Sequence, residues 1–180
     1  MTAEYVNDYM LRLSEEMKGQ YVISPRYLND VNLKRGLRNA DGTGVLVGVT
    51  GIGSVQGYIV EDGVRVPQKG RLYYRGISME DIVEAHRKND TFGFEEVAYL
   101  LIVGKLPTSE QLKEFNEILA AARDLPKGFY EDMILKIPSR NIMNKLGRCV
   151  LALYSYDKDP DNTSLENMVK QSIVLMARFP

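Results

Sequence analysis

Two side chains with the chemistry of a nucleophile or a general base occur once each in this sequence. His86 is the single histidine and Cys149 the single cysteine among 180 residues. Both Cys–His and Ser–His–Asp catalysis require a histidine, so either mechanism would have to use His86. A cage of His and Cys ligands for a metal ion needs three or four of them. We therefore expect no metal site of this kind, and the role of His86 is the first functional question.

The surroundings of both residues favour structural roles. His86 falls in the last turn of a predicted helix, where a cation interacts favourably with the free carbonyl groups. No motif supplies a nucleophile or an orienting partner for it. Cys149 lies in an apolar helical segment, where a free cysteine behaves as a small hydrophobic residue in a core or an interface. The sequence predicts no catalytic role for either residue.

Three other patterns could bind or act on a ligand. The glycine-rich stretch 42–57 lacks the dinucleotide-binding spacing, and strands and turns follow it in place of a helix. Glu95 and Glu96 are adjacent, so they do not share a helix face as a pair of catalytic carboxylates would. A short basic cluster comprises Lys34, Arg35 and Arg38. It could bind a phosphate-bearing anion such as CoA or a nucleotide, although a solvated loop is the simpler interpretation. We predict no cofactor-binding residue.

Composition excludes several classes of protein. With 44% hydrophobic and 26% charged residues and a net charge of -1, the chain resembles an ordinary globular domain with one core. It lacks the basic face of a nucleic-acid-binding protein. Its longest apolar run, Val97–Val103, is far shorter than the ~20 residues that span a bilayer. The first ten residues do not resemble a secretory signal, and a single cysteine fits a reducing cytoplasm. We expect a cytoplasmic protein without nucleic-acid or membrane partners.

The first 76 residues combine a helix with short strands. Four-residue spacing of apolar side chains predicts a helix over Ala3–Lys18, which Gly19 ends, and an extended arm continues to residue 40. Residues 41–76 form a small β element with Asp62-Gly63 as a hairpin turn. The predicted strands are Val45–Thr50, Ser54–Val60, Val64–Val66 and Arg71–Tyr74.

Residues 77–180 are predicted to be helical. Capping boxes are expected at Ser78 with Asp81, at Thr108 with Gln111, and at Thr163 with Glu166. The predicted helices are Met79–Arg87, Phe94–Val103, one opened by Thr108 and ended by Pro126, Phe129–Ile137, Ser139–Tyr156, and one from Thr163 to Arg178. The fold class is therefore mainly α, with a small β-sheet or hairpin near residues 45–75, and the chain is expected to form a single unit.

The helix predicted over Ser139–Tyr156 has a broad apolar face. Its members are Ile142, Met143, Leu146, Cys149, Val150 and Leu153. The helix that follows has a similar face. Helical spacing does not decide whether these faces form an internal core or a surface for a partner.

Several segments together resemble the citrate synthase family, over about residues 33–180. They are Leu72-Tyr73-Tyr74-Arg75-Gly76-Ile77, Met79-Glu80-Asp81-Ile82, Phe94-Glu95-Glu96-Val97-Ala98-Tyr99-Leu100-Leu101 and Gly104-Lys105-Leu106-Pro107-Thr108. The segment Ile142-Met143-Asn144-Lys145-Leu146 and the stretch from Ile173 to Pro180 look like the next two family segments. The resemblance implies the N-terminal part of the large helical domain of that family.

The resemblance also implies a function. Citrate synthases are tricarboxylic acid cycle acyltransferases that condense acetyl-CoA with oxaloacetate, and they need no further cofactor. The family's catalytic histidines and aspartate match no position here, so no catalytic residue is expected in this chain and none is assigned to His86. The apolar end at Leu175–Pro180 predicts a truncated, inactive fragment of a longer enzyme.

Oligomerisation follows from the same resemblance. The family's homodimer interface is built largely from helices that resemble the last two predicted here. The six apolar residues from Ile142 to Leu153 are therefore expected at a dimer interface. Two alternatives remain open, a 2-methylcitrate synthase fragment and a non-catalytic helical module for oligomerisation or interaction.

Overall fold

The computed structural model describes residues 2–20, 22–24, 26 and 50–180. The chain divides into two compact units. We call Met17–Leu112 the β unit, and Met1–Glu16 with Lys113–Pro180 the helical unit. The basic cluster Lys34, Arg35 and Arg38, and all but the last residue of the strand predicted over 45–50, lie outside the described residues.

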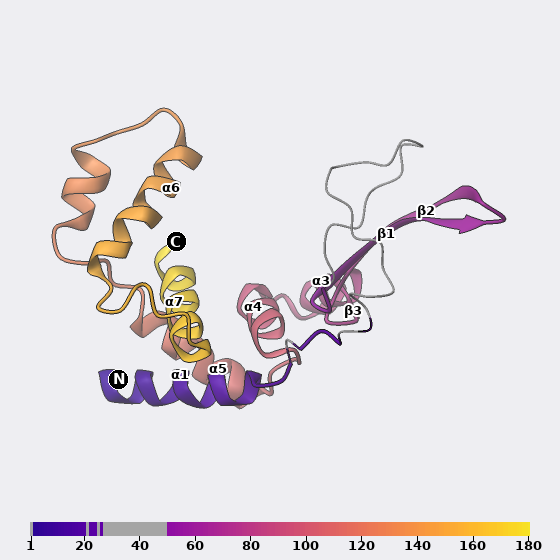
Figure 1. Ribbon diagram of the computed structural model, residues 1–180, viewed down its shortest axis with the longest axis horizontal. Helices are drawn as coiled ribbons and strands as arrows, with labels where there is room; N and C mark the ends of the chain where they lie inside the picture. Colours follow the sequence, from indigo (N-terminus) through magenta and orange to yellow (C-terminus); the bar gives the residue numbers. More distant parts are fainter. Residues whose placement is uncertain (1, 21, 25, 27–49) are drawn as a thin grey trace. The chain divides into compact units, whose positions relative to one another are not determined.

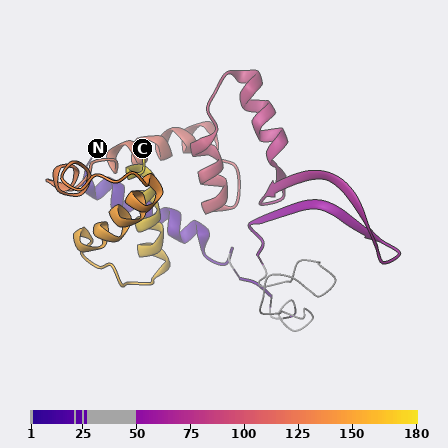
Figure 2. The same ribbon diagram turned by 90° about the horizontal axis from the view of Figure 1, so that it is seen from above.

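The β unit is built on a long antiparallel hairpin. Strand β1 (Gly53–Glu61) pairs with β2 (Val64–Tyr74), and β2 pairs with the short β3 (Ile77–Ser78). The three-stranded sheet has the order β1-β2-β3 (Figures 1 and 2). We predicted β2 as two separate strands, and this was wrong. The weak strand formers Pro67 to Gly70 stay in the strand because the register shifts between Gln56 and Tyr58 and accommodates the extra residues.

Both turns of the sheet use paired residues with positive φ. Asp62 and Gly63 have φ angles of 48° and 78°, which confirms the predicted hairpin turn. Arg75 and Gly76, with φ angles of 51° and 81°, reverse the chain between β2 and β3 in the same way. The Arg-Gly pair of the Tyr-Arg-Gly motif is therefore a turn.

Two helices follow the sheet in the β unit, α3 (Met79–Asn89) and α4 (Phe94–Val103). Ser78 is the N-cap of α3, but its side chain makes no cap hydrogen bond, so the predicted capping box with Asp81 is wrong. Ser78 is also a strand residue paired with Tyr73, which fixes its backbone. Helix α4 has the predicted bounds and ends at Gly104, whose φ is 88°. Buried residues of the unit are Met17, Ile82, Ala98, Tyr99, Leu100 and Val103.

The helical unit contains most of α1 (Ala3–Met17), α5 (Ser109–Ala121) from Lys113 onward, the π-helical turn η1 (Tyr130–Leu135), α6 (Ile142–Leu153), the 3-10 turn η2 (Tyr154–Tyr156) and α7 (Leu165–Arg178). The start of α5 belongs to the β unit, and there Thr108 and Gln111 exchange the predicted capping-box hydrogen bonds, at 3.2 and 2.9 Å. The predicted cap of α7 is wrong by one residue, because Ser164 accepts from the Asn167 N–H while Thr163 precedes the cap. The buried apolar side chains of this unit come from α1, α5 and α7 and from Phe129, which precedes η1. They are Tyr9, Met10, Leu13, Phe115, Ile118, Leu119, Phe129, Val169, Ile173 and Ala177.

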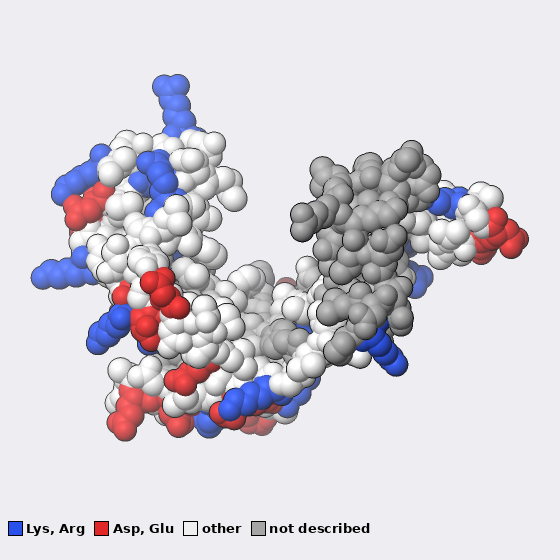
Figure 3. Space-filling model, viewed as in Figure 1, with Lys and Arg blue, Asp and Glu red and all other residues white. Residues whose placement is uncertain are grey.

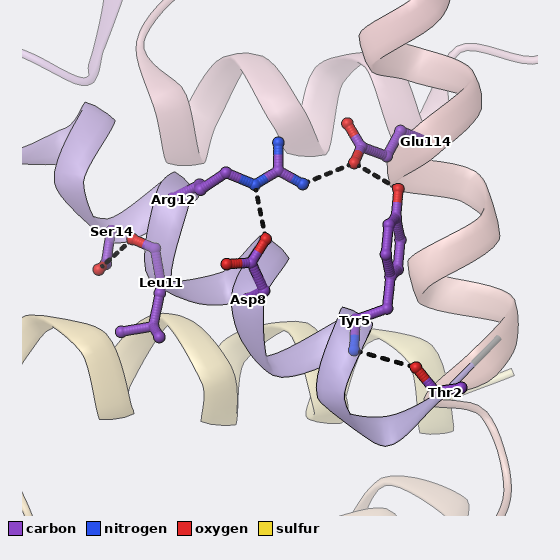
Figure 4. Close-up of polar contacts among 7 residues, drawn as sticks. All are labelled: Thr2, Tyr5, Asp8, Leu11, Arg12, Ser14 and Glu114. Atoms are coloured by element: carbon purple, nitrogen blue, oxygen red, sulfur yellow. Dashed lines mark hydrogen bonds and ion pairs between the residues drawn. The ribbon is translucent and has the colours of Figure 1, made fainter.

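A polar network joins α1 to α5 (Figure 4). Glu114 accepts hydrogen bonds from the Tyr5 hydroxyl at 2.7 Å and from Arg12 Nη2 at 2.8 Å, and Arg12 also bonds Asp8. Burial raises the pKa of Glu114, but the hydrogen bonds from Arg12 and Tyr5 outweigh it and hold that pKa below its usual range. The network fixes how the first helix of the chain packs on α5.

Candidate interaction surface

Helix α6 begins at a side-chain cap. Asn141 has the extended backbone of an N-cap, and its side-chain oxygen accepts from the Asn144 N–H at 2.9 Å. The Asn141 N–H in turn donates to the Ser139 hydroxyl at 3.2 Å. We predicted a helix from Ser139, and it starts three residues later because Ser139 and Asn141 form a turn ahead of it. After α6 ends at Leu153, the last three residues of the predicted helix form the 3-10 turn η2.

The apolar face predicted on this helix is left uncovered by the described residues of the chain. Ile142 and Met143 are 78% and 74% exposed, and Leu146 is 36% exposed. Cys149, Val150 and Leu153 are half-buried, and no residue of α6 is buried. A helix that leaves large apolar side chains exposed forgoes roughly 1.5–3 kcal/mol for each one that a core would bury.

Helix α7 behaves differently. Its residues Val169, Ile173 and Ala177 are buried, so most of its apolar face belongs to the core of the helical unit. The loop before it is held by two amides of the helix. Asn167 Nδ2 donates to the carbonyl oxygens of Asp159 and Asn162, both at 2.9 Å, and Gln171 Nε2 donates to Asp157 Oδ2 at 3.1 Å. Of the two helices that spacing alone could not distinguish, α7 packs in the core, whereas the described residues leave Ile142, Met143 and Leu146 of α6 exposed.

His86 has partners that the sequence did not reveal. It lies in the last turn of α3, and its Nε2 is 2.6 Å from Glu96 Oε2 in the first turn of α4. Its Nδ1 is 2.8 Å from the Thr91 hydroxyl, and its carbonyl oxygen accepts from the Thr91 N–H. A Cβ on Gly93 would lie 2.5 Å from the ring. The histidine therefore fills the turn between two helices, and its pairing with Glu96 has no helix-face spacing by which the sequence could reveal it.

Three of the motifs that carry the resemblance meet at the end of α4. Arg75 leaves the β2–β3 turn and donates from Nη2 to the Leu101 carbonyl oxygen at 3.0 Å, in the last turn of α4. Gly104 ends that helix, and a Cβ there would approach both Gln20 and Arg75. A cation is favourable at the carbonyl end of a helix. Arg75 of the Tyr-Arg-Gly motif thus ties the sheet to α4, which Gly104 of the Gly-Lys-Leu-Pro motif ends.

The remaining candidates form no reactive cluster among the described residues. Glu95 and Glu96 lie in the first turn of α4, and Glu96 is engaged with His86. Cys149 is a half-buried free thiol on α6. Within the part of the chain that the structure describes, no three His, Cys, Asp or Glu side chains are grouped to hold a metal ion, and no helix is long and apolar enough to cross a membrane.

Comparison with known proteins decides the family. The family model described as citrate synthase, C-terminal domain, matches residues 41–180. The chain belongs to the citrate synthase family. It is 30% identical over 154 residues to 2-methylcitrate synthase 1 of Corynebacterium glutamicum, an alignment that covers 85% of this chain and 35% of that protein. It is 34% identical over 130 residues to the citrate synthase of Haloferax volcanii, covering 72% of this chain and 29% of that one.

A solved structure shares the fold. The crystal structure of citrate synthase from Pyrobaculum aerophilum matches with a TM-score of 0.58 and 23% identity, over 82% of this chain and 37% of that chain. The mainly α fold with a small antiparallel sheet is confirmed. The chain spans about a third of the length of the citrate synthase relatives it matches.

Proposed function

We propose that these 180 residues are the N-terminal part of the large domain of a citrate synthase, which condenses acetyl-CoA with oxaloacetate, and that they build scaffold and dimer surface while the catalytic groups lie elsewhere. The observation that carries the proposal is the bare apolar face of α6 on a chain of this family. The single histidine supports it as well, because His86 is engaged by Glu96 and Thr91 in an interhelical turn.

The catalytic part of the proposal is tested with the chain alone. Acetyl-CoA and oxaloacetate are added and thiol release is followed, with a reaction lacking oxaloacetate as the background because Cys149 is itself a thiol. We expect no oxaloacetate-dependent release. Turnover by the chain that a His86→Gln variant abolishes would contradict the proposal, because it would place catalysis within these residues.

The dimer part of the proposal assigns the α6 face to a second copy of the chain. Ile142, Met143 and Leu146 would form its exposed centre, with Cys149, Val150 and Leu153 beside them. Burying such a face on both copies removes apolar surface from water, which is the main driving force for association.

A matched pair of variants tests the α6 face. Met143→Glu places a charge on this face, whereas Leu151→Glu places the same charge about 80° from Met143 and about 140° from the centre of the face. The two native side chains are equally exposed, at 74% and 76%. Sedimentation velocity over a concentration series should show that Met143→Glu weakens association and Leu151→Glu does not. Equal behaviour of the two variants, or a monomeric parent chain at high concentration, would refute the assignment.

A 2-methylcitrate synthase is the second candidate. Two relatives of this chain are 2-methylcitrate synthases of Corynebacterium glutamicum, at 30% and 34% identity to it. If these residues are scaffold, they should not set the choice between acetyl-CoA and propionyl-CoA. A chimera of 2-methylcitrate synthase 1 carrying this chain in place of its matching segment should then keep the acyl-CoA preference of its host. A changed preference would assign specificity to this chain.

A further inference from the structure

The β1–β2 hairpin offers a strand edge that no other described strand occupies. In the sheet order β1-β2-β3, β1 lies at the edge and pairs with β2 alone among the described strands. Almost the whole strand is exposed, including Val55 at 80%, Tyr58 at 46%, Ile59 at 42% and Val60 at 62%. Unpaired N–H and C=O groups along such an edge are a template for another strand.

The opposite edge of the same sheet is protected. β3 covers β2 only at Tyr73 and Tyr74. The rest of β2 carries Pro67 and the cations Arg65, Lys69 and Arg71, and proline and cations are the residues by which natural sheets discourage edge pairing. β1 has no proline, lysine or arginine, and its one charge is Glu61 at its end. Of the two edges of the described sheet, the β2 edge therefore discourages pairing and the β1 edge does not.

We propose that β1 pairs with β1 of a second copy of this chain, antiparallel and centred on Gly57, so that two hairpins form one continuous sheet. Val55 and Ile59 share a face of the hairpin, because they are four residues apart on β1 and successive side chains of a strand alternate between its two faces. In the proposed register Val55 lies opposite Ile59 of the second copy on that face. This symmetric self-match is what a two-fold interface requires.

Charge selects this orientation and favours a second copy as the occupant. A parallel pair would set Glu61 beside Glu61 of the other copy, and like charges directly opposite are destabilising. The antiparallel pair separates the two Glu61 side chains by eight residues, about 26 Å at the rise of a strand. It also moves the acidic turn formed by Glu61 and Asp62 toward the half of the other hairpin that carries Arg71. Figure 3 shows the acidic side chains gathered at the hairpin turn and basic ones farther from it.

Cross-linking of single cysteines tests the register. In a Cys149→Ser background, one cysteine is placed at Val55, Gly57, Ile59 or, as the matched control on the other strand, Val64, which is 64% exposed. Gly57 has no heavy atom within 4 Å of an added Cβ, so it accommodates cysteine. Across the proposed axis the two copies of position 57 face each other, whereas positions 55 and 59 lie about 13 Å from their own copies.

The profile of cross-linked dimer should therefore peak at the Gly57→Cys variant and fall on both sides. Mixing the Val55→Cys and Ile59→Cys variants should give more cross-linked dimer than either variant alone, because these positions face each other. A flat profile, a maximum at Val64, or no cross-linking of the chain would overturn the proposal.

A second measurement separates this interface from the α6 face. The Gly57→Cys experiment is repeated with Met143→Glu, which removes the proposed α6 contact, and the cross-link should persist. Adding Tyr58→Lys to β1 should abolish the cross-link, whereas Gln68→Lys on β2 should leave it. Loss of the cross-link with Met143→Glu alone would overturn an independent β1 interface.

Discussion

Helices α6 and α7 are close in length and amphipathic character, and they differ in what covers them. α7 buries Val169, Ile173 and Ala177, whereas among the described residues α6 has half-buried apolar side chains but no fully buried one. α7 is also anchored by polar contacts, since Asn167 and Gln171 hold the loop that precedes it. The comparison shows that an apolar helix face predicts only that the helix packs against another element. Whether that partner is internal depends on the rest of the fold.

Truncating one isoleucine on each helix should produce the largest contrast. Ile173→Ala removes a fully buried side chain and should lower the free energy of unfolding by about 2–5 kcal/mol, through lost transfer energy and the cavity left behind. Ile142→Ala, at a side chain that is 78% exposed, should change it by less than about 0.5 kcal/mol. Urea denaturation of both variants measures the contrast. Equal losses would mean that α6 is part of the core.

The buried amide of α7 should give the next effect. Asn167→Leu removes the two donors to the carbonyl oxygens of Asp159 and Asn162 and should cost about 1–3 kcal/mol. Asn144→Leu on α6 serves as the control, because only the backbone N–H of Asn144 takes part in its cap. If the denaturation midpoints of the two variants coincide, the loop is not held by Asn167.

Removing the caps tests whether the two helices unfold together. Ser164→Ala and Asn141→Ala each delete the side-chain acceptor at a helix start, at a cost of about 1 kcal/mol to that helix. Since α7 is part of the core, Ser164→Ala should lower global stability. Asn141→Ala should instead increase amide hydrogen exchange within α6 alone. Faster exchange throughout the helical unit in the Asn141 variant would contradict the comparison.

The smallest effect concerns acid stability of the loop between the helices. The Asp159 N–H and the Gln171 amide donate to Asp157 and, against its partial burial, hold the pKa of that carboxyl below its usual range. A carboxylate with a lowered pKa stabilises the fold above its unfolded pKa, about 3.9, and loses that contribution as the pH falls through the folded value. The parent chain should exceed Asp157→Asn in stability near neutrality, and the gap should close below about pH 4. Urea midpoints across that range measure it, and a constant gap would exclude Asp157 as the cause.

Local signals were enough to predict much of the fold. The positive-φ turn at Asp62-Gly63, the capping box of Thr108 and Gln111, and the glycine that ends α4 are each set by a few adjacent residues, and all were predicted. The joining of β2 across Pro67 was missed because it depends on how β1 pairs with it. The cap of α7 was misplaced by one residue because Thr163 and Ser164 are both good caps, and the Ser164 N–H is held by the Asn162 side chain two residues earlier.

The candidate interaction surface was only partly predictable from the sequence. The apolar face of α6 followed from spacing, but its exposure did not, since exposure depends on residues far away in the chain. The partnership of His86 with Glu96 joins two helices through a turn, and no periodicity reports it. The assignment of α6 to a dimer remains a prediction.

The turn around His86 has a consequence for which sequences this fold can accept. The imidazole occupies the space where a side chain at position 93 would begin, although the backbone of Gly93, at φ -109°, would suit any residue. Position 93 is thus restricted to glycine by its neighbour, and the restriction should disappear when His86 is replaced by a smaller residue. The two positions are expected to change together, so Gly93→Ala should be tolerated in a His86→Ala background and rejected in the parent chain.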